Sequence, residues 1–182
     1  MTIDRTNPDI VAEVVEKLIP EGTNPRVWLE FLADSISTAN DLHPNCWGVT
    51  LQKKLIRLNV GKIEALAFLP GLFHCIIDLD TIPVKINEYE RDEKVELHKN
   101  KNNPAAGFYE SVEGSVICNI FVEEFNENLG EVLQLIQDSH RLLIKNASRT
   151  PRHPRTKIAH SPSVIDYLSS YLGRNIQQPE YF

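Results

Sequence analysis

Cysteine is scarce in this chain of 182 residues, and the three that occur, Cys46, Cys75 and Cys118, are odd in number. They are widely spaced and lie among apolar residues, a pattern that favours neither a disulfide framework nor a paired C-x-x-C zinc site. We therefore expect reduced, buried thiols and a cytoplasmic protein.

Long apolar runs are also lacking. No segment approaches the roughly 18 apolar residues that a membrane-spanning helix needs. No basic-plus-apolar signal peptide opens the chain. We expect neither secretion nor a membrane partner.

Diagnostic enzyme motifs are missing as well. The sequence has no G-x-x-x-x-G-K-[ST] phosphate loop, no G-x-G-x-x-G turn, no G-x-S-x-G elbow and no H-E-x-x-H metal motif. This lowers the expectation of catalysis, favours a binding function and gives no reason to expect a cofactor.

What is present fits one globular domain spanning residues 1–182. Hydrophobic residues make up 42% of the chain and charged residues 24%, which is ordinary for a soluble domain of this length. No internal repeat divides the sequence.

Helix starts share one chemistry: an Asn or Ser with capping potential precedes a proline at the first helical position. The pairs are Asn7-Pro8, Asn24-Pro25 and Ser161-Pro162. Apolar residues at helical spacing then predict helices over 8–19, 25–42, 126–145 and 161–172, the third capped by Asn126 or Asn128 and the last ended by Gly173.

Short apolar runs with a period of two fill the middle of the chain and predict strands over 46–51, 55–60, 63–69, 73–79 and 115–122. The breaks between the first four are short enough for hairpins. A further strand is expected at 84–87, followed by a mobile loop over 88–103 that is rich in Glu, Lys and Asn. The sequence therefore predicts an α+β fold, an antiparallel meander of about five or six strands with two N-terminal and two C-terminal helices packed on it.

Charge is segregated along the sequence. The chain carries −6 overall, but residues 149–160, the basic segment, hold four Lys or Arg and no carboxylate, so the remainder carries about −10. Prolines stiffen this segment, and arginine suits bidentate contacts with phosphate or carboxylate. The predicted helix start at Ser161 adds backbone amides and a positive dipole end. The candidate anion-binding residues are Arg149, Arg152, His153, Arg155, Lys157, His160 and Ser161. The alternative is that the segment lies over an acidic surface of its own domain.

A second candidate lies in the predicted strand 55–60, where alternation puts Arg57 and Asn59 on one face. We expect them across the hairpin from Trp47 and Val49, so that an aromatic ring, a guanidinium and an amide share one sheet surface. Such a surface suits a base or another planar ligand. The alternative is an ordinary solvated sheet face with Trp47 buried.

A third candidate is the end of the predicted strand 73–79, where His74, Ile76, Asp78 and Asp80 are expected on one face. Two carboxylates two residues apart could hold a divalent cation for phosphodiester chemistry. The strand at 115–122 lacks the lysine that a nuclease of the acidic-Lys type would need, so solvation of the strand end is favoured over a metal site.

Together these features predict a small binding domain that recognises an anionic partner, and they favour nucleic acid or a nucleotide as that partner. The competing hypothesis is a protein–protein interaction or regulatory subunit in a homo- or hetero-oligomer, where the acidic body and basic segment make complementary contacts. A metal-dependent phosphodiester hydrolase built on Asp78 and Asp80 is the third and weakest hypothesis.

Overall fold

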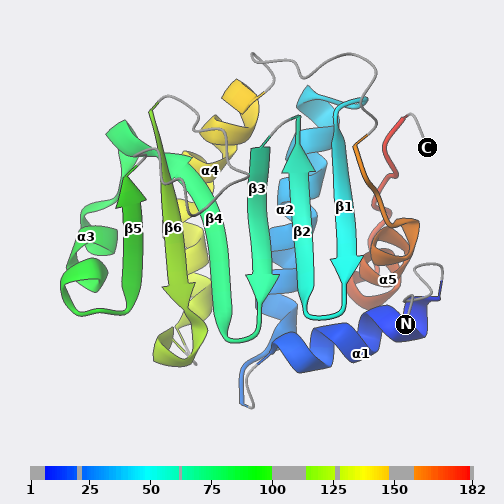
Figure 1. The fold of residues 1–182 in the computed structure, drawn as a ribbon, viewed down its shortest axis with the longest axis horizontal. Helices are drawn as coiled ribbons and strands as arrows, with labels where there is room; N and C mark the ends of the chain where they lie inside the picture. Colours follow the sequence, from blue (N-terminus) through cyan, green and yellow to red (C-terminus); the bar gives the residue numbers. More distant parts are fainter. Residues whose placement is uncertain are drawn as a thin grey trace.

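The protein, described here by a computed structural model over residues 7–19, 22–61, 63–99, 114–125, 128–147 and 158–180, has an α+β fold. Six antiparallel strands form one sheet, and helices α2 and α4 cover one of its faces (Figure 1). The architecture predicted from the sequence is confirmed.

Two helices precede the strands and two follow them, and a fifth helix lies between the fourth and fifth strands. The helices are α1 (Pro8–Leu18), α2 (Pro25–Leu42), α3 (Val84–Arg91), α4 (Leu129–Ala147) and α5 (Pro162–Leu172). The strands are β1 (Trp47–Gln52), β2 (Leu55–Val60), β3 (Ile63–Leu69), β4 (Leu72–Asp78), β5 (Val95–Lys99) and β6 (Ser115–Phe121). Two 3-10 turns, Leu79–Thr81 and Val122–Phe125, follow β4 and β6.

The strand order is β1-β2-β3-β4-β6-β5. The first four strands are joined by successive hairpins, as short turns between apolar runs predict. Strand β6 then enters the sheet between β4 and β5, pairing antiparallel with both. The last two strands are therefore out of sequence order, and the outer edges of the sheet are β1 and β5.

Alternation gives the sheet two unlike faces. On the helix face, defined as the face that α2 and α4 cover, one register row contains Val49, Leu58, Leu66, Cys75 and Cys118, all fully buried. Burial of such apolar side chains is the main stabilising term of the fold. The alternate positions of each strand point to the opposite side, called here the second face, and none of the described helices lies over it (Figure 1).

Aromatic rings join α2 to the helix face. Trp28 lies 4.0 Å from Phe68 between ring centroids, and Phe31 meets Phe73 edge-on at 5.4 Å. Edge-on and tilted arrangements are the favoured geometries for such pairs. They fix α2 against β3 and β4.

Helix α4 packs against β4 and carries a histidine on its buried face. His140 is 1% exposed, and its Nδ1 donates a hydrogen bond of 2.8 Å to the carbonyl oxygen of Ile76. None of the helices in the described ranges is long and apolar enough to cross a membrane.

All three predicted helix starts are confirmed, and two of the three N-cap side chains bond to the first turn. The Asn7 and Asn24 side chains each accept a hydrogen bond of 3.0 Å from a backbone N–H in the first turn. Ser161 occupies the third N-cap position but makes no such bond, because its hydroxyl accepts from the Leu51 N–H of β1 instead. Gly173 ends α5 at φ +64°, the left-handed conformation that glycine favours.

The prediction for residues 84–103 was wrong over its described part. Residues 84–87 begin helix α3 rather than a strand, and residues 88–99 complete α3 and form β5 rather than a mobile loop. Each element is anchored by one fully or almost fully buried residue, Ile86 in α3 and Val95 in β5. Edge elements need few apolar contacts, so their composition resembles that of a loop. Residues 100–103 lie outside the described ranges.

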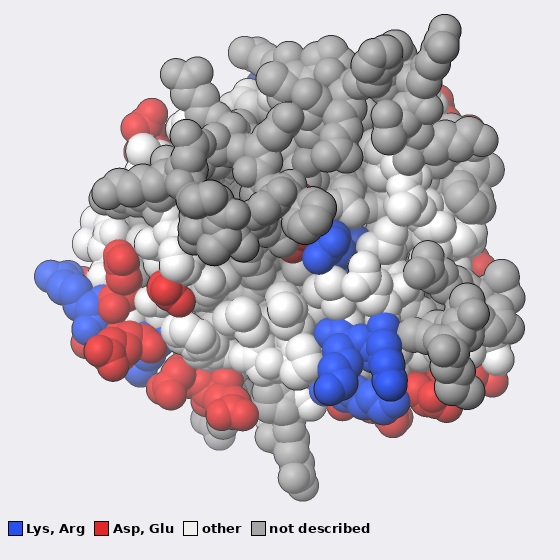
Figure 2. Space-filling model, in the orientation of Figure 1, with Lys and Arg blue, Asp and Glu red and all other residues white. Residues whose placement is uncertain are grey.

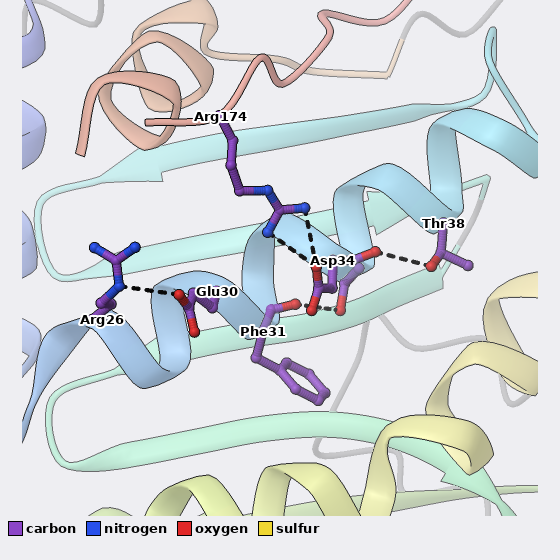
Figure 3. A network of polar contacts seen from close by, with 7 residues as sticks. Arg26, Glu30, Phe31, Asp34, Thr38 and Arg174 are labelled. Carbon is purple, nitrogen blue, oxygen red and sulfur yellow. Dashed lines mark hydrogen bonds and ion pairs between the residues drawn. The ribbon is translucent and has the colours of Figure 1, made fainter. Parts of the chain in front are cut away.

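The chain after α5 runs back towards α2. Both terminal nitrogens of Arg174 donate to Asp34 Oδ1 at 3.1 Å, and the two side chains point toward one another in Figure 3. Asn40 adds a bond of 3.0 Å from its amide nitrogen to Gln177. Because Arg174 and Asp34 are well exposed, their ion pair contributes little stability and mainly orients the segment.

Candidate functional site

Polar side chains from five strands form one register row on the second face. In strand order the row is Thr50, Arg57, Ala67, His74, Asn119 and Glu96, each residue directly opposite the next. Side chains directly opposite each other in antiparallel strands share a face and lie within contact range. The sheet therefore gathers hydrogen-bonding groups that are far apart in the sequence.

Arg57 is balanced by a buried carboxylate. A β-bulge between Leu58 and Asn59 sets Glu64 opposite Asn59, and the Arg57 Nε lies 2.8 Å from Glu64 Oε2. The N–H direction misses hydrogen-bond geometry, so this contact is an ion pair rather than an aligned hydrogen bond. The Glu64 side chain is only 6% exposed and that of Arg57 is 31% exposed. Glu64 thus compensates most of the Arg57 charge, and the terminal N–H groups of the guanidinium are the remaining donors of Arg57.

His74 and Asn119 form the centre of the row. The His74 Nδ1 donates to Asn119 Oδ1 at 2.8 Å. Burial lowers the pKa of His74, while the nearby Glu64 charge and the Asn119 bond oppose this shift. The imidazole is therefore uncharged at neutral pH and holds the amide of Asn119 by its oxygen.

An exposed aromatic ring lies beside this pair. Phe121 is two residues beyond Asn119 on the same strand, so both side chains lie on the second face, and Phe121 is 36% exposed. It pairs with Leu72, which is two residues from His74. Aromatic and polar groups therefore share one part of the sheet.

Further ionisable side chains lie towards the two ends of the row. At the β5 end, His98 Nε2 lies 2.9 Å from Glu96 Oε1, and both side chains are about half exposed. At the other end, Lys53 and Lys54 are exposed at the turn between β1 and β2. Figure 2 shows Lys and Arg side chains gathered below this hairpin, while much of the described surface between the margins is uncharged.

The basic segment is described only at its last three residues, and Arg149, Arg152, His153, Arg155 and Lys157 lie outside the described ranges. Its end is fixed to the sheet edge: the Ser161 N–H donates to Val49 O at 2.7 Å, and the Val49 N–H donates to His160 Nδ1 at 3.1 Å. A methyl group on Gly48 would collide with the backbone of Ala159. Residues 158–161 thus cover part of the outer edge of β1.

His160 and Ser161 have internal roles. The His160 Nε2 donates to Gln178 Oε1 at 2.6 Å, and burial lowers the pKa of His160 despite that bond. Ser161 is 1% exposed. The predicted helix start is therefore packed against β1, and we leave both residues out of the binding surface.

The expected grouping of Trp47 and Val49 with Arg57 and Asn59 was wrong. Trp47 pairs with Val60 and Val49 with Leu58, so both lie on the helix face, and Trp47 is fully buried. The residues opposite Asn59 and Arg57 are Gly48 and Thr50. The cause is the loop length: the hairpin turns on two residues, Lys53 and Lys54, not three, and a register slip of one residue exchanges the faces.

The carboxylates at the end of β4 do not share one strand face. Asp78 ends β4 on the second face with His74 and Ile76, as predicted, but Asp80 lies in the following 3-10 turn. The Asp78 N–H donates to Ser139 Oγ at 3.0 Å. Among the described residues no group of three or more His, Cys, Asp or Glu side chains is placed to hold a metal ion.

Comparison of the chain with models of known protein families, with curated proteins and with solved structures found no match. The function of the site can therefore be inferred only from its geometry. Sequence reasoning missed Glu64, Asn119 and Phe121 as parts of it. Alternation in 115–121 does place Asn119 and Phe121 on one face, but nothing local shows that β4 is the neighbouring strand.

Proposed function

We propose that this chain is a small binding domain for an anionic partner, nucleic acid or a nucleotide, held through the basic segment and the adjoining second face of the sheet. The observation that carries the proposal is the attachment of residues 158–161 to β1. It brings the end of the basic segment beside Gly48, and Gly48 is directly opposite Asn59.

Charge distribution supports this proposal. The body of the chain carries about −10 without the basic segment, so an anion is attracted locally rather than by the molecule as a whole. Arginines spaced every third residue suit phosphate contacts, and Arg57 with Asn59 adds hydrogen-bond donors on the adjacent strand.

The test is binding of a fluorescent single-stranded oligonucleotide over a range of salt concentrations. Binding should weaken steeply with salt, and Arg152→Ala with Arg155→Ala should reduce the log–log salt slope by about 0.7 per lost phosphate contact. The matched control is Lys53→Ala with Lys54→Ala, which removes the same charge from exposed positions at the far end of β1. That control should bind like the wild type.

No retention of single-stranded or double-stranded DNA or RNA at low salt would refute the proposal. An equal loss in both double variants would instead indicate non-specific attraction. Sedimentation of the same proteins checks the competing oligomer hypothesis, which predicts a mass that is a multiple of the chain mass and that falls in the arginine variant.

A further inference from the structure

The part of the second face around Phe121 differs chemically from a phosphate site. Arg57 is paired with Glu64, the imidazole of His74 is uncharged at neutral pH, and Glu96 adds a negative charge at the end of the row. These four side chains together therefore carry no net positive charge that would attract a phosphate. This part of the second face suits an uncharged ligand that stacks and forms hydrogen bonds.

Phe121 supplies the apolar contact. Its ring is 36% exposed on a sheet face that no described helix covers (Figure 1). His74 lies on the neighbouring strand at the diagonal position, about 7–8 Å away between Cα atoms in an antiparallel ladder. A planar group lying on Phe121 would thus have polar side chains at its edge.

Asn119 and Arg57 supply hydrogen-bonding groups. The Asn119 oxygen is held by His74, and this contact does not use the two N–H donors of the amide. Arg57, whose side chain is 31% exposed, lies two strands from His74, about 10 Å across the sheet, and Ala67 between them is fully buried. Arg57 is therefore a second contact point towards β1, where residues 158–161 lie, and not a continuation of the exposed surface around Phe121.

We infer that the second face binds single-stranded nucleic acid through its bases, with Phe121 as the stacking surface and Asn119 and Arg57 as donors to base edges. This inference rests on the proposed function and assigns the bases to a different surface from the phosphates. Unpaired bases are required, because bases stacked in a duplex cannot lie on an aromatic side chain. His74 is a positioning residue that fixes the Asn119 amide.

The experiment compares two fluorescent 12-nucleotide probes with equal phosphate counts, oligothymidylate and an abasic strand, at one salt concentration. Wild-type protein should bind oligothymidylate about 5- to 150-fold more tightly, the range expected for stacking of one base. Phe121→Leu should remove most of that preference and leave affinity for the abasic strand unchanged. Asn119→Ala should reduce the preference in part.

The matched control is Tyr171→Leu, which removes another aromatic side chain that is 40% exposed, on α5. It should keep the full preference. If wild-type protein binds both probes equally with a steep salt dependence, the inference fails and the proposed function survives. If neither probe binds, the inference fails, and retention of RNA or of double-stranded DNA at low salt then decides whether the proposed function fails with it.

If the Phe121→Leu variant does not fold, photocrosslinking of the wild-type protein tests the same inference. An oligonucleotide carrying 5-bromodeoxyuridine should crosslink to the peptide that contains residues 115–121. Crosslinks confined to other described strands or helices would overturn the assignment of the bases to this face.

Discussion

Acidification should destabilise the fold through His140, the histidine of α4 that is 1% exposed. Burial lowers the pKa of His140 from 6.5 to about 4, against the opposing effect of its bond to Ile76 O, and the nearby Arg141 lowers it further. The Nε2 atom is buried and has no hydrogen-bond partner among the described residues. A proton added there would be a buried, uncompensated charge.

The magnitude follows from linkage between protonation and folding. The unfolded chain takes up a proton on this ring near pH 6.5, whereas the folded chain does so only near pH 4. The contribution of the neutral His140 ring to the free energy of unfolding is therefore fully present above pH 6.5, and it is lost as the pH falls from 6.5 to about 4. The shift corresponds to about 3 kcal/mol of unfolding free energy.

Urea unfolding at pH 7.5 and pH 4.5 measures this loss. His140→Gln keeps an N–H donor for the Ile76 carbonyl but does not titrate, so between these pH values it should lose about 2–3 kcal/mol less stability than the wild type. The matched control is Phe31→Leu, which alters the ring that packs 5.4 Å from His140 and leaves the histidine in place. It should be less stable at both pH values yet show the wild-type pH dependence.

Equal acid losses in wild type and His140→Gln would refute this reasoning. The comparison between variants is essential, because burial also lowers the pKa of His74 and of His160, and both act in the same direction. An NMR titration of the His140 ring gives an independent check, since its signals should report the neutral form down to about pH 4.

Two further substitutions test the contacts around the site. Gly48→Ala should destabilise the protein by about 1–3 kcal/mol, because the new methyl group collides with the Ala159 backbone. Hydrogen exchange of the backbone amides of residues 158–161 should become faster in this variant. Unchanged protection of these amides would contradict the contact. Glu64→Gln should cost about 1–2 kcal/mol by leaving Arg57 uncompensated, less than for a fully buried pair because Arg57 is partly exposed. Thermal unfolding measures the second effect, and the ion pair would be refuted as a stabilising contact if the melting temperature did not fall.

Local signals predicted most of the elements. Asn-Pro pairs and apolar spacing gave the starts of α1 and α2, and short turns between period-two runs gave the first four strands. The edge elements α3 and β5 were missed, because each has a single deeply buried residue, and their other core contacts, Tyr89 and Leu97, are only partly buried and stand among charged residues. Their stability comes from neighbours rather than from their own pattern, as in the edge-on contact between Tyr89 of α3 and Phe125.

The candidate site was predicted only in fragments. Arg57, Asn59 and His74 stood out in their own strands, but the Trp47 partner was wrong through a register slip of one residue. Glu64 faces Asn59 only because a β-bulge shifts β3 by one position. Neither the bulge nor the loop length has a strong enough local signature to fix the register.

By itself, the sequence determined the α+β class, the starts of α1, α2 and α5, the order of the first four strands and the segregation of positive charge into residues 149–160. These follow from capping, periodicity and composition, which act over a few neighbouring residues. Only the tertiary structure decided that β6 lies between β4 and β5, and so that Asn119 and Phe121 share a face with His74 and Arg57. Strand order depends on the burial of whole faces by distant elements, and no short stretch of sequence encodes it.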